Sequence, residues 1–218
     1  MPDIFPEPTR IIAIRHGETA WNVSTRIQGQ LDIGLNEKGR WQADRVAQAL
    51  AGEPIAALYS SDLLRAWDTA LSISNATGLP VQTVEGLRER GFGIFEGKTF
   101  QEIEAQWPDH ALRWRQREPD FEPEGGESLL RFRERITQTV HAQAALHPGG
   151  QIVLVAHGGV MDVLYRAATR QEIQAPRTWN LGNATINRLL WTPNGLSLVG
   201  WADSQHLENG DALDESSA

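Results

Sequence analysis

The stretch "RIIAIRHGETAWN", Arg10–Asn22, joins a short apolar run directly to a cluster of polar side chains. The run Ile11–Ile14 is typical of a parallel strand that is covered on both faces of its sheet. The strand ends in Arg15 and His16, and Gly17 follows at once. Glycine at such a point lets a backbone N–H approach a ligand closely. The stretch therefore predicts a buried strand whose tip carries chemistry.

A second stretch, "QIVLVAHGG", repeats this pattern much later in the chain. It is again an apolar run that ends in a histidine, His157, followed by Gly158. A lone histidine is more often a structural residue than a functional one. In parallel sheets, however, ligands bind beyond the carboxyl ends of the strands. Because His16 and His157 occupy the same place on two predicted strands, we expect them to belong to one site.

Predicted strands alternate with predicted helices along the chain. Apart from the two runs above, we predict strands over 55–61 and 81–85 and a closing hairpin over 184–203. Apolar spacing and end signals predict helices over 37–51, 62–78, 128–146 and 160–169, with Asn36 capping the first. This alternation predicts an α/β fold, a three-layer α/β/α sandwich with a mostly parallel sheet and helices on both faces.

The chain shows no internal repeat and no linker long enough to divide it. We therefore expect a single domain over residues 1–218. Residues 91–126 are irregular, with short helical pieces over 100–107 and 111–116, and are expected to form a small cap insertion over the site. The polar, acidic segment 204–218 is expected to be a mobile tail.

The composition limits the partners that the protein can have. The formal net charge of -8 at pH 7 argues against nucleic acid or an anionic membrane as a partner. There is no cysteine, which excludes disulfides and thiolate metal ligands and favours a cytoplasmic location. No run approaches the roughly 18 apolar residues of a membrane span. The N-terminal segment also lacks the basic and apolar regions of a signal peptide.

The polar residues near the predicted strand ends suit phosphoryl transfer. A transferred phosphoryl group spreads negative charge over its equatorial oxygens and needs fixed cations, for which Arg15 and Arg65 are suited. A neutral imidazole, as in His16, can attack phosphorus without a metal-bound water. A carboxylic acid such as Glu89 can protonate the leaving oxygen. Together with His157, these residues could form one phosphoryl-transfer site.

The order of these motifs resembles the histidine phosphatase superfamily, also called the phosphoglycerate-mutase-like family. The matching segments cover roughly Arg10 to Ala202. They read "RHGET-x-WN", "IQGQLDIGLNEKGRWQA", "YSSDLLRAWDTA", "LRERGFGIFEG", "GGESLLRFRERI" and "VAHGGV".

The resemblance implies a role for each candidate residue. His16 would be phosphorylated and then hydrolysed, while Arg15 and Arg65 would hold the phosphoryl oxygens. His157 would donate a further hydrogen bond as an imidazolium. Glu89 would act first as general acid and then as base for the attacking water.

The resemblance also implies further contacts around the phosphate. Asn22 matches the family's phosphate-contacting asparagine, and Gln28 matches a position that lines the same pocket. Gly158 would leave room for the phosphate beside the backbone. No metal and no cofactor would be needed. The remaining histidines show no ligand spacing with an acidic cluster.

Residues 89–93 distinguish the two main activities of this family. Its phosphoglycerate mutases typically read Glu-Arg-His-Tyr-Gly there, whereas this chain reads Glu-Arg-Gly-Phe-Gly. The insertion that follows is also shorter than in the mutases. We therefore predict a metal-independent phosphomonoester hydrolase that acts through a phosphohistidine on a small phosphorylated metabolite. The alternatives are a cofactor-dependent phosphoglycerate mutase and, beyond that, a non-catalytic phosphate-binding module. Either a monomer or a homodimer is compatible with the sequence.

The expected cap is rich in aromatic residues and contains two arginines, Arg113 and Arg117, spaced as if one helical turn apart. In one interpretation the aromatic side chains fill the cap's own small core and the arginines are solvated. In the other, the cap holds an apolar or sugar-like leaving group and one arginine binds a second anionic group. The aromatic residues concerned are Phe92, Phe95, Trp107, Trp114 and Phe121.

Overall fold

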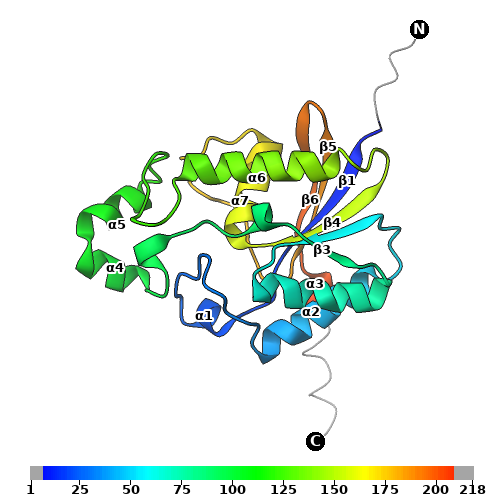
Figure 1. The fold of residues 1–218 in the computed structure, drawn as a ribbon, viewed down its shortest axis with the longest axis horizontal. Coiled ribbons are helices and arrows are strands. Elements are labelled where there is room, and N and C mark those ends of the chain that lie inside the picture. Colours follow the sequence, from blue (N-terminus) through cyan, green and yellow to red (C-terminus); the bar gives the residue numbers. More distant parts are fainter. Residues whose placement is uncertain (1–6, 209–218) are drawn as a thin grey trace, which may run out of the picture.

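The computed structural model describes residues 7–208, which form an α/β/α sandwich around a six-stranded sheet (Figure 1). The strand order is β3-β2-β4-β1-β5-β6. The four strands β1 to β4 run parallel, and the hairpin β5–β6 joins β1 antiparallel. The predicted fold class is thereby confirmed. The strands are β1 (Thr9–Arg15), β2 (Ala57–Ser60), β3 (Val81–Thr83), β4 (Gln151–Ala156), β5 (Ile186–Thr192) and β6 (Gly195–Asp203).

Two pairs of helices cover the two faces of the sheet (Figure 1). Successive strand residues point to opposite faces, so each face receives every second side chain. In β1, Ile12 and Ile14 pack toward α2 (Glu37–Leu50) and α3 (Leu64–Thr77). On the other face, Ile11 and Ala13 pack toward α6 (Leu129–Ala144) and α7 (Gly158–Thr169). Burial on both faces explains why β1 and β4 are continuously apolar.

The helix ends carry the signals that the sequence contains. The side chain of Asn36 accepts a hydrogen bond from the Gly39 N–H at 2.7 Å and caps α2. Ser128 caps α6 in the same way through the Arg131 N–H at 3.2 Å. Gly78 ends α3 in the left-handed conformation, with φ at 75°.

The cap insertion stands at one end of the sandwich, beside the carboxyl ends of the parallel strands (Figure 1). Its aromatic side chains surround Phe95 and Ile103 and form a small core of their own, at whose edge Phe92 and Trp114 stay half-buried. The short elements of the insertion and of its approach are α1 (Ala20–Val23), the 3₁₀ turns η1 (Glu85–Leu87) and η2 (Gly93–Phe95), α4 (Phe100–Gln106) and α5 (Pro108–Arg115).

The two cap arginines do not share a helix face, contrary to their spacing. Helix α5 ends at Arg115, and Arg117 follows in the left-handed conformation with φ at 52°. Arg113 pairs with Glu118 at 2.6 Å and lies over the ring of Phe121. Arg117 turns instead toward α7 (Gly158–Thr169), where its Nη2 donates a hydrogen bond to Oδ2 of Asp162 at 2.9 Å.

The first residues of the segment predicted to be a mobile tail, 204–208, pack against the domain instead. Helix α8 (Gln205–Glu208) follows β6, and Leu207 packs against the apolar cluster under α2. The carbonyl oxygen of His206 accepts a hydrogen bond from Arg45 Nε of α2 at 2.7 Å. The rest of the predicted tail, residues 209–218, lies outside the described residues.

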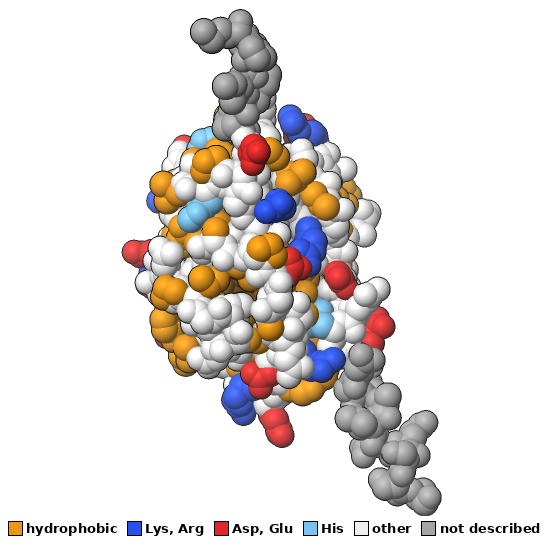
Figure 2. Space-filling view, turned by 90° about the vertical axis from the view of Figure 1, so that its right-hand side faces the viewer, with side chains coloured by type: hydrophobic (Ala, Val, Ile, Leu, Met, Phe, Trp, Pro, Cys, Tyr) orange, Lys and Arg blue, Asp and Glu red, His pale blue; other side chains and the backbone are white. Residues whose placement is uncertain are grey.

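The face turned away from the cap carries scattered charges of both signs among apolar side chains (Figure 2). In this view, the described residues form no continuous basic patch. No helix within residues 7–208 is both long and apolar enough to cross a membrane.

Candidate active site

The register of β1 on β4 brings the two strand-end histidines together. Arg15 pairs with Ala156, so His16 and His157 are the next residues on two neighbouring strands. Their ring centroids are 5.4 Å apart, and their exposed fractions are 2% and 0%. The structure thus places both histidines at the edge of the sheet where the sequence pattern predicts a site.

Local hydrogen bonds orient the His16 ring. Its Nδ1–H donates to the carbonyl oxygen of Gly17 at 2.7 Å, so the neutral ring carries its lone pair on Nε2. Asn183 Nδ2 donates to the His16 carbonyl oxygen at 2.9 Å. Burial, together with the nearby Arg65 and Arg15, keeps the pKa of His16 well below its usual value. The ring is therefore a neutral base with one free nitrogen, as a nucleophile requires.

Two arginines, the buried Arg65 and the half-buried Arg15, lie beside this histidine. Arg65, in the first turn of α3, donates to the carbonyl oxygens of Gly29 at 2.7 Å and Leu31 at 2.9 Å. Arg15 donates to the carbonyl oxygen of Leu181 through Nη1. Burial lowers the pKa of Arg65 to about 10, so its guanidinium remains charged at neutral pH. Within the described part of the chain, Nε of each arginine is buried without a hydrogen-bond partner.

His157 is held from the neighbouring strand end. Its Nε2 lies 2.8 Å from Oγ of Ser61, the residue directly after β2, and its buried Nδ1 has no partner among residues 7–208. Burial, then Arg65, keeps the pKa of His157 well below its usual value. These causes favour a neutral His157 ring in the folded chain, whereas the imidazolium expected beside a bound phosphoryl group stays a prediction. The physical reason is that burial and two cations beside the ring oppose a further positive charge.

Glu89 is fixed at the amino end of α7. Its Oε2 accepts a hydrogen bond from the Gly159 N–H at 2.8 Å, and its Oε1 accepts one from the Arg90 N–H at 2.9 Å. A Cβ atom on residue 159 would lie 2.2 Å from Glu89 Oε1, so only glycine leaves room for the carboxylate. Arg135 on α6 donates to the Glu89 carbonyl oxygen at 3.2 Å and fixes the loop behind it.

A pocket of about 170 Å³ opens between these side chains. It is lined by Arg15, His16, Asn22, Gln28, Arg65 and Glu89, together with Arg26, Ile27, Gly29 and Phe92. Two predicted residues do not line it: His157, whose ring centroid is 5.4 Å from that of His16, and Gly158, which lies beside Arg15.

The two amide residues of the pocket are held differently. The Oδ1 atom of Asn22 accepts a hydrogen bond from the Thr19 N–H at 3.0 Å, which orients its amide. Gln28 is 9% exposed, and its Oε1 has no partner within the described chain. The Gln28 amide is therefore available to a ligand.

The unpartnered buried nitrogens indicate what this pocket can bind. Arg15 Nε, Arg65 Nε and His157 Nδ1 are left without partners in the described structure, although buried polar atoms are almost always paired. In the tautomer in which the Ser61 hydroxyl donates to Nε2, the neutral His157 ring carries its proton on Nδ1 and gives a third donor. Arg15 and Arg65 line the pocket together with His16 and Glu89, so their donors suit a tetrahedral anion there, while the third donor belongs to the ring that packs beside His16. The arrangement is that of a phosphoryl-transfer site.

Some residues of this arrangement carry no distinct signal in the sequence. Ser61 could be noticed only from its place at the carboxyl end of β2. Thr69 accepts a hydrogen bond from the Gly17 N–H at 3.1 Å, and Asn183 comes from the loop before β5. Within residues 7–208, no three histidine, aspartate or glutamate side chains are grouped as a metal site would need.

Comparison with known proteins identifies the family. Residues 11–204 match the model of the histidine phosphatase superfamily (branch 1). The chain belongs to this superfamily, which confirms the resemblance found in the sequence and the predicted class of enzyme, a phosphatase.

Three similar proteins illustrate the range of the family. Phosphoglycerate mutase-like protein 4 of Arabidopsis thaliana is 39% identical, covering 91% of this chain and 86% of its own. A metal-independent phosphoserine phosphatase of the same plant is 37% identical, covering 93% and 85%. The structure of a mycobacterial glucosyl-3-phosphoglycerate phosphatase complexed with VO3 has a TM-score of 0.79 at 35% identity, covering 89% of this chain and 99% of that one.

The buried neutral histidines should make stability depend on pH. The pKa of His16 is lower in the folded than in the unfolded chain, so the unfolded chain binds more protons below pH ~6.5. The stabilising contribution is therefore present above that pH and is lost as the pH falls. We expect His16 to account for a loss of up to about 2 kcal/mol in the free energy of unfolding between pH 7 and pH 5.

This loss is measured by urea unfolding of the wild type and of His16→Gln across the pH range. The variant keeps a buried polar side chain but cannot titrate there. Its free energy of unfolding should fall less steeply than that of the wild type. Identical slopes would mean that His16 is not held neutral by the fold.

Proposed function

We propose that the protein is a metal-independent phosphomonoesterase that transfers the phosphoryl group of a small metabolite to His16 and then to water. The observation that carries this proposal is the set of buried donors without partners around the neutral His16 ring. A phosphate oxygen can accept a hydrogen bond from each of these buried donors, which makes such donors favourable sites for binding a phosphoryl group. The charged Arg15 and Arg65 would bind the phosphoryl oxygens.

In the first chemical step, His16 Nε2 attacks phosphorus and forms a P–N bond. The bond between phosphorus and the ester oxygen breaks, and the Glu89 carboxyl gives its proton to that oxygen, which leaves as an alcohol. In the second step, water attacks phosphorus while the Glu89 carboxylate takes one of its protons. The P–N bond breaks, inorganic phosphate leaves and His16 is neutral again. Arg15, Arg65 and His157 would stabilise the charge on the phosphoryl oxygens in both steps.

The motif at residues 89–93 and the relative named as a phosphoserine phosphatase favour hydrolysis over isomerisation. Phosphoserine and glucosyl-3-phosphoglycerate, for which two relatives are named, are both phosphate monoesters that carry a carboxylate. We propose such monoesters as the first compounds to test, in a cytoplasmic protein that acts as a monomer or homodimer.

The test measures phosphate release from phosphoserine, 3-phosphoglycerate and p-nitrophenyl phosphate in excess EDTA. A parallel assay follows formation of 2-phosphoglycerate from 3-phosphoglycerate with a bisphosphoglycerate primer. We expect phosphate release that EDTA does not inhibit, at a rate well above isomerisation. Isomerisation without release would establish the mutase instead. If neither occurs and no phosphohistidine can be trapped, the protein is a phosphate-binding module.

A further inference from the structure

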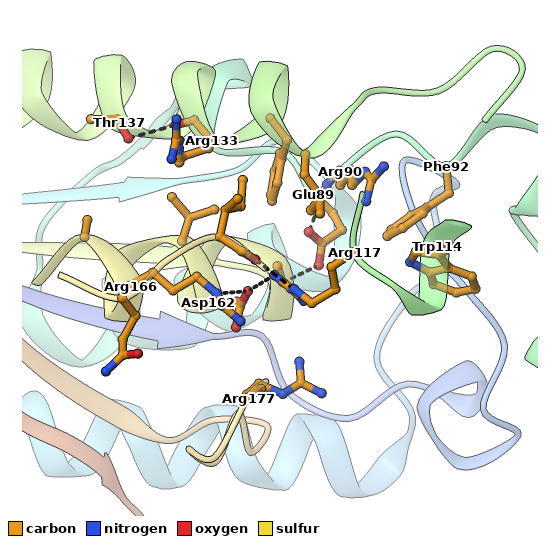
Figure 3. A pocket seen from close by; sticks show the side chains of 17 residues that line it. Glu89, Arg90, Phe92, Trp114, Arg117, Arg133, Thr137, Asp162, Arg166 and Arg177 are labelled. Carbon is orange, nitrogen blue, oxygen red and sulfur yellow. Dashed lines mark hydrogen bonds and ion pairs between the residues drawn. The ribbon is translucent and has the colours of Figure 1, made fainter. Parts of the chain in front are cut away.

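A larger cavity, of about 300 Å³, adjoins the phosphate pocket. Glu89 and Phe92 line both spaces, so the proposed general acid lies where the cavity and the phosphate pocket meet. Figure 3 shows Glu89 at this space, with Phe92 and Trp114 side by side at one end and Arg133 toward the other. We call this cavity between α6, α7, the cap and residues 171–177 the leaving-group groove.

The walls of the groove near Glu89 are largely apolar. The rings of Phe92 and Trp114 lie with centroids 5.7 Å apart, and Phe132 and Leu129 of α6 continue the wall. Val163 of α7 forms the opposite side. A hydrophilic leaving group such as serine would leave these side chains without contacts, whereas an apolar one would bury them.

The groove also carries an excess of positive charge. Arg117 and Arg166 both bind Oδ2 of Asp162 at 2.9 Å, and both donate to carbonyl oxygens of the 171–177 segment, so their positions are fixed by the fold. Arg133 and Arg177 are exposed, and in the described structure neither makes an ion pair. These two guanidinium groups are the ones available to an anion.

Arg177 links the groove electrostatically to the phosphate pocket. Burial is the main cause of the lowered pKa of Arg15 in the phosphate pocket and of Arg117 in the groove. The positive charge of Arg177 contributes to lowering both pKa values. A negative group on the substrate would relieve this repulsion among the cations.

The groove extends along α6 beyond the space that a small leaving group needs. Thr137 lies five residues after Phe132, which places it about 7.5 Å further along the helix axis. A neighbouring cavity of about 140 Å³ is also lined by Thr137, Val163 and Ala167. The apolar space therefore continues between α6 and α7.

Resting on the proposed phosphatase activity, we propose that the leaving-group groove selects phosphomonoesters with an extended apolar body that ends in an anionic group. The ester oxygen would lie at Glu89, the apolar body along Phe132 and Val163, and the terminal anion at Arg133. Hydrolysis would release inorganic phosphate and the corresponding ω-hydroxy acid.

The test uses a series of ω-phosphonooxy carboxylic acids with two to eight carbon atoms, each beside the uncharged alkyl phosphate of equal length. Each methylene buried in the groove should raise kcat/KM about fourfold, until the chain reaches Arg133. At that length the carboxylate should be preferred over its uncharged counterpart by about tenfold.

Two variants examine the end of the groove. Arg133→Met should lower the preference for the carboxylate about tenfold, to near one. Arg131→Met is the matched control, because Arg131 lies on the same helix and pairs with Glu122 outside the groove, and it should keep the wild-type preference. Thr137→Phe should shift the optimum to shorter chains by filling the groove.

The outcomes separate this inference from the function on which it rests. If the wild type hydrolyses p-nitrophenyl phosphate through His16 but shows no dependence on chain length, the groove does not select the leaving group, and the phosphatase stands. Equal effects of Arg133→Met and Arg131→Met would overturn the anion site. If no ester is hydrolysed, the proposed function fails, and the inference fails with it.

Discussion

His16→Ala is expected to lower kcat for every phosphomonoester by at least about 10,000-fold, as removal of a catalytic nucleophile does in other enzymes. The P–N bond cannot form without the imidazole, so the route through a covalent intermediate is lost. Binding should respond differently, because Arg15 and Arg65 keep their positions on β1 and α3. We expect the Kd of inorganic phosphate to change less than about tenfold, since charge-assisted hydrogen bonds to the arginines dominate it.

Both quantities are measured on the same sample, kcat by phosphate release and Kd by calorimetry. His16→Gln is the control for the cavity that alanine leaves, because the ring is only 2% exposed. It should be as inactive as alanine with a higher Tm. If activity and phosphate binding are lost together, the structure of the pocket is disrupted in the variant. The loss of turnover then does not support a nucleophilic role of His16. Activity within tenfold of the wild type would contradict the proposed role of His16.

Glu89→Gln is expected to lower kcat for phosphoserine by about 100- to 10,000-fold, the usual contribution of a general acid or base. The alkoxide of serine is a poor leaving group and needs the proton that the carboxyl supplies. Nitrophenolate leaves without a proton, so formation of the phosphohistidine from p-nitrophenyl phosphate should be nearly as fast as in the wild type. Its hydrolysis should remain slow, because the carboxylate that activates water is missing.

Rapid-mixing kinetics distinguish these steps. The variant should release about one nitrophenolate per active site in a burst and then turn over slowly, and phosphohistidine should accumulate at His16. Phosphoserine should give no burst. Equal slowing of the first step for both esters would show that Glu89 does not protonate the leaving group, and that Glu89 contributes only through its hydrogen bonds to Gly159 and Arg90.

Much of the fold could be predicted because local signals and tertiary structure agree. The apolar runs of β1 and β4 report burial on both faces, and Asn36 and Ser128 mark the starts of their helices. The tail could not be predicted, because the contact of Leu207 with the α2 side of the core is purely tertiary. Polar composition gave the opposite expectation for these residues.

The spacing of Arg113 and Arg117 was misleading for a similar reason. A separation of four residues predicts one helix face, but α5 ends at Arg115. Asp162, 45 residues further along the chain, holds Arg117 in its place. No local pattern contains a partner at that distance.

The site could be predicted as a set of residues but not as a charge distribution. His16 and His157 were recognisable because each directly follows a buried strand. The protonation of His157 depends on Arg65 and on burial, which come together only in the folded chain. The hydrogen bond between Ser61 and His157 likewise forms only in the folded chain, so the sequence alone does not single out Ser61.

The pairing of Arg15 with Ala156 has a consequence for how the chain can vary in length. Side chains alternate between the two faces along a strand, so one residue inserted into β1 or deleted from it would reverse every position up to the next fixed point. His16 would then leave its place beside His157. The central strands can therefore exchange one apolar residue for another but cannot gain or lose a residue. The turn between β5 and β6 can change in length, because it does not set the register of β1 on β4. Gains and losses of residues should collect in such turns and in the cap.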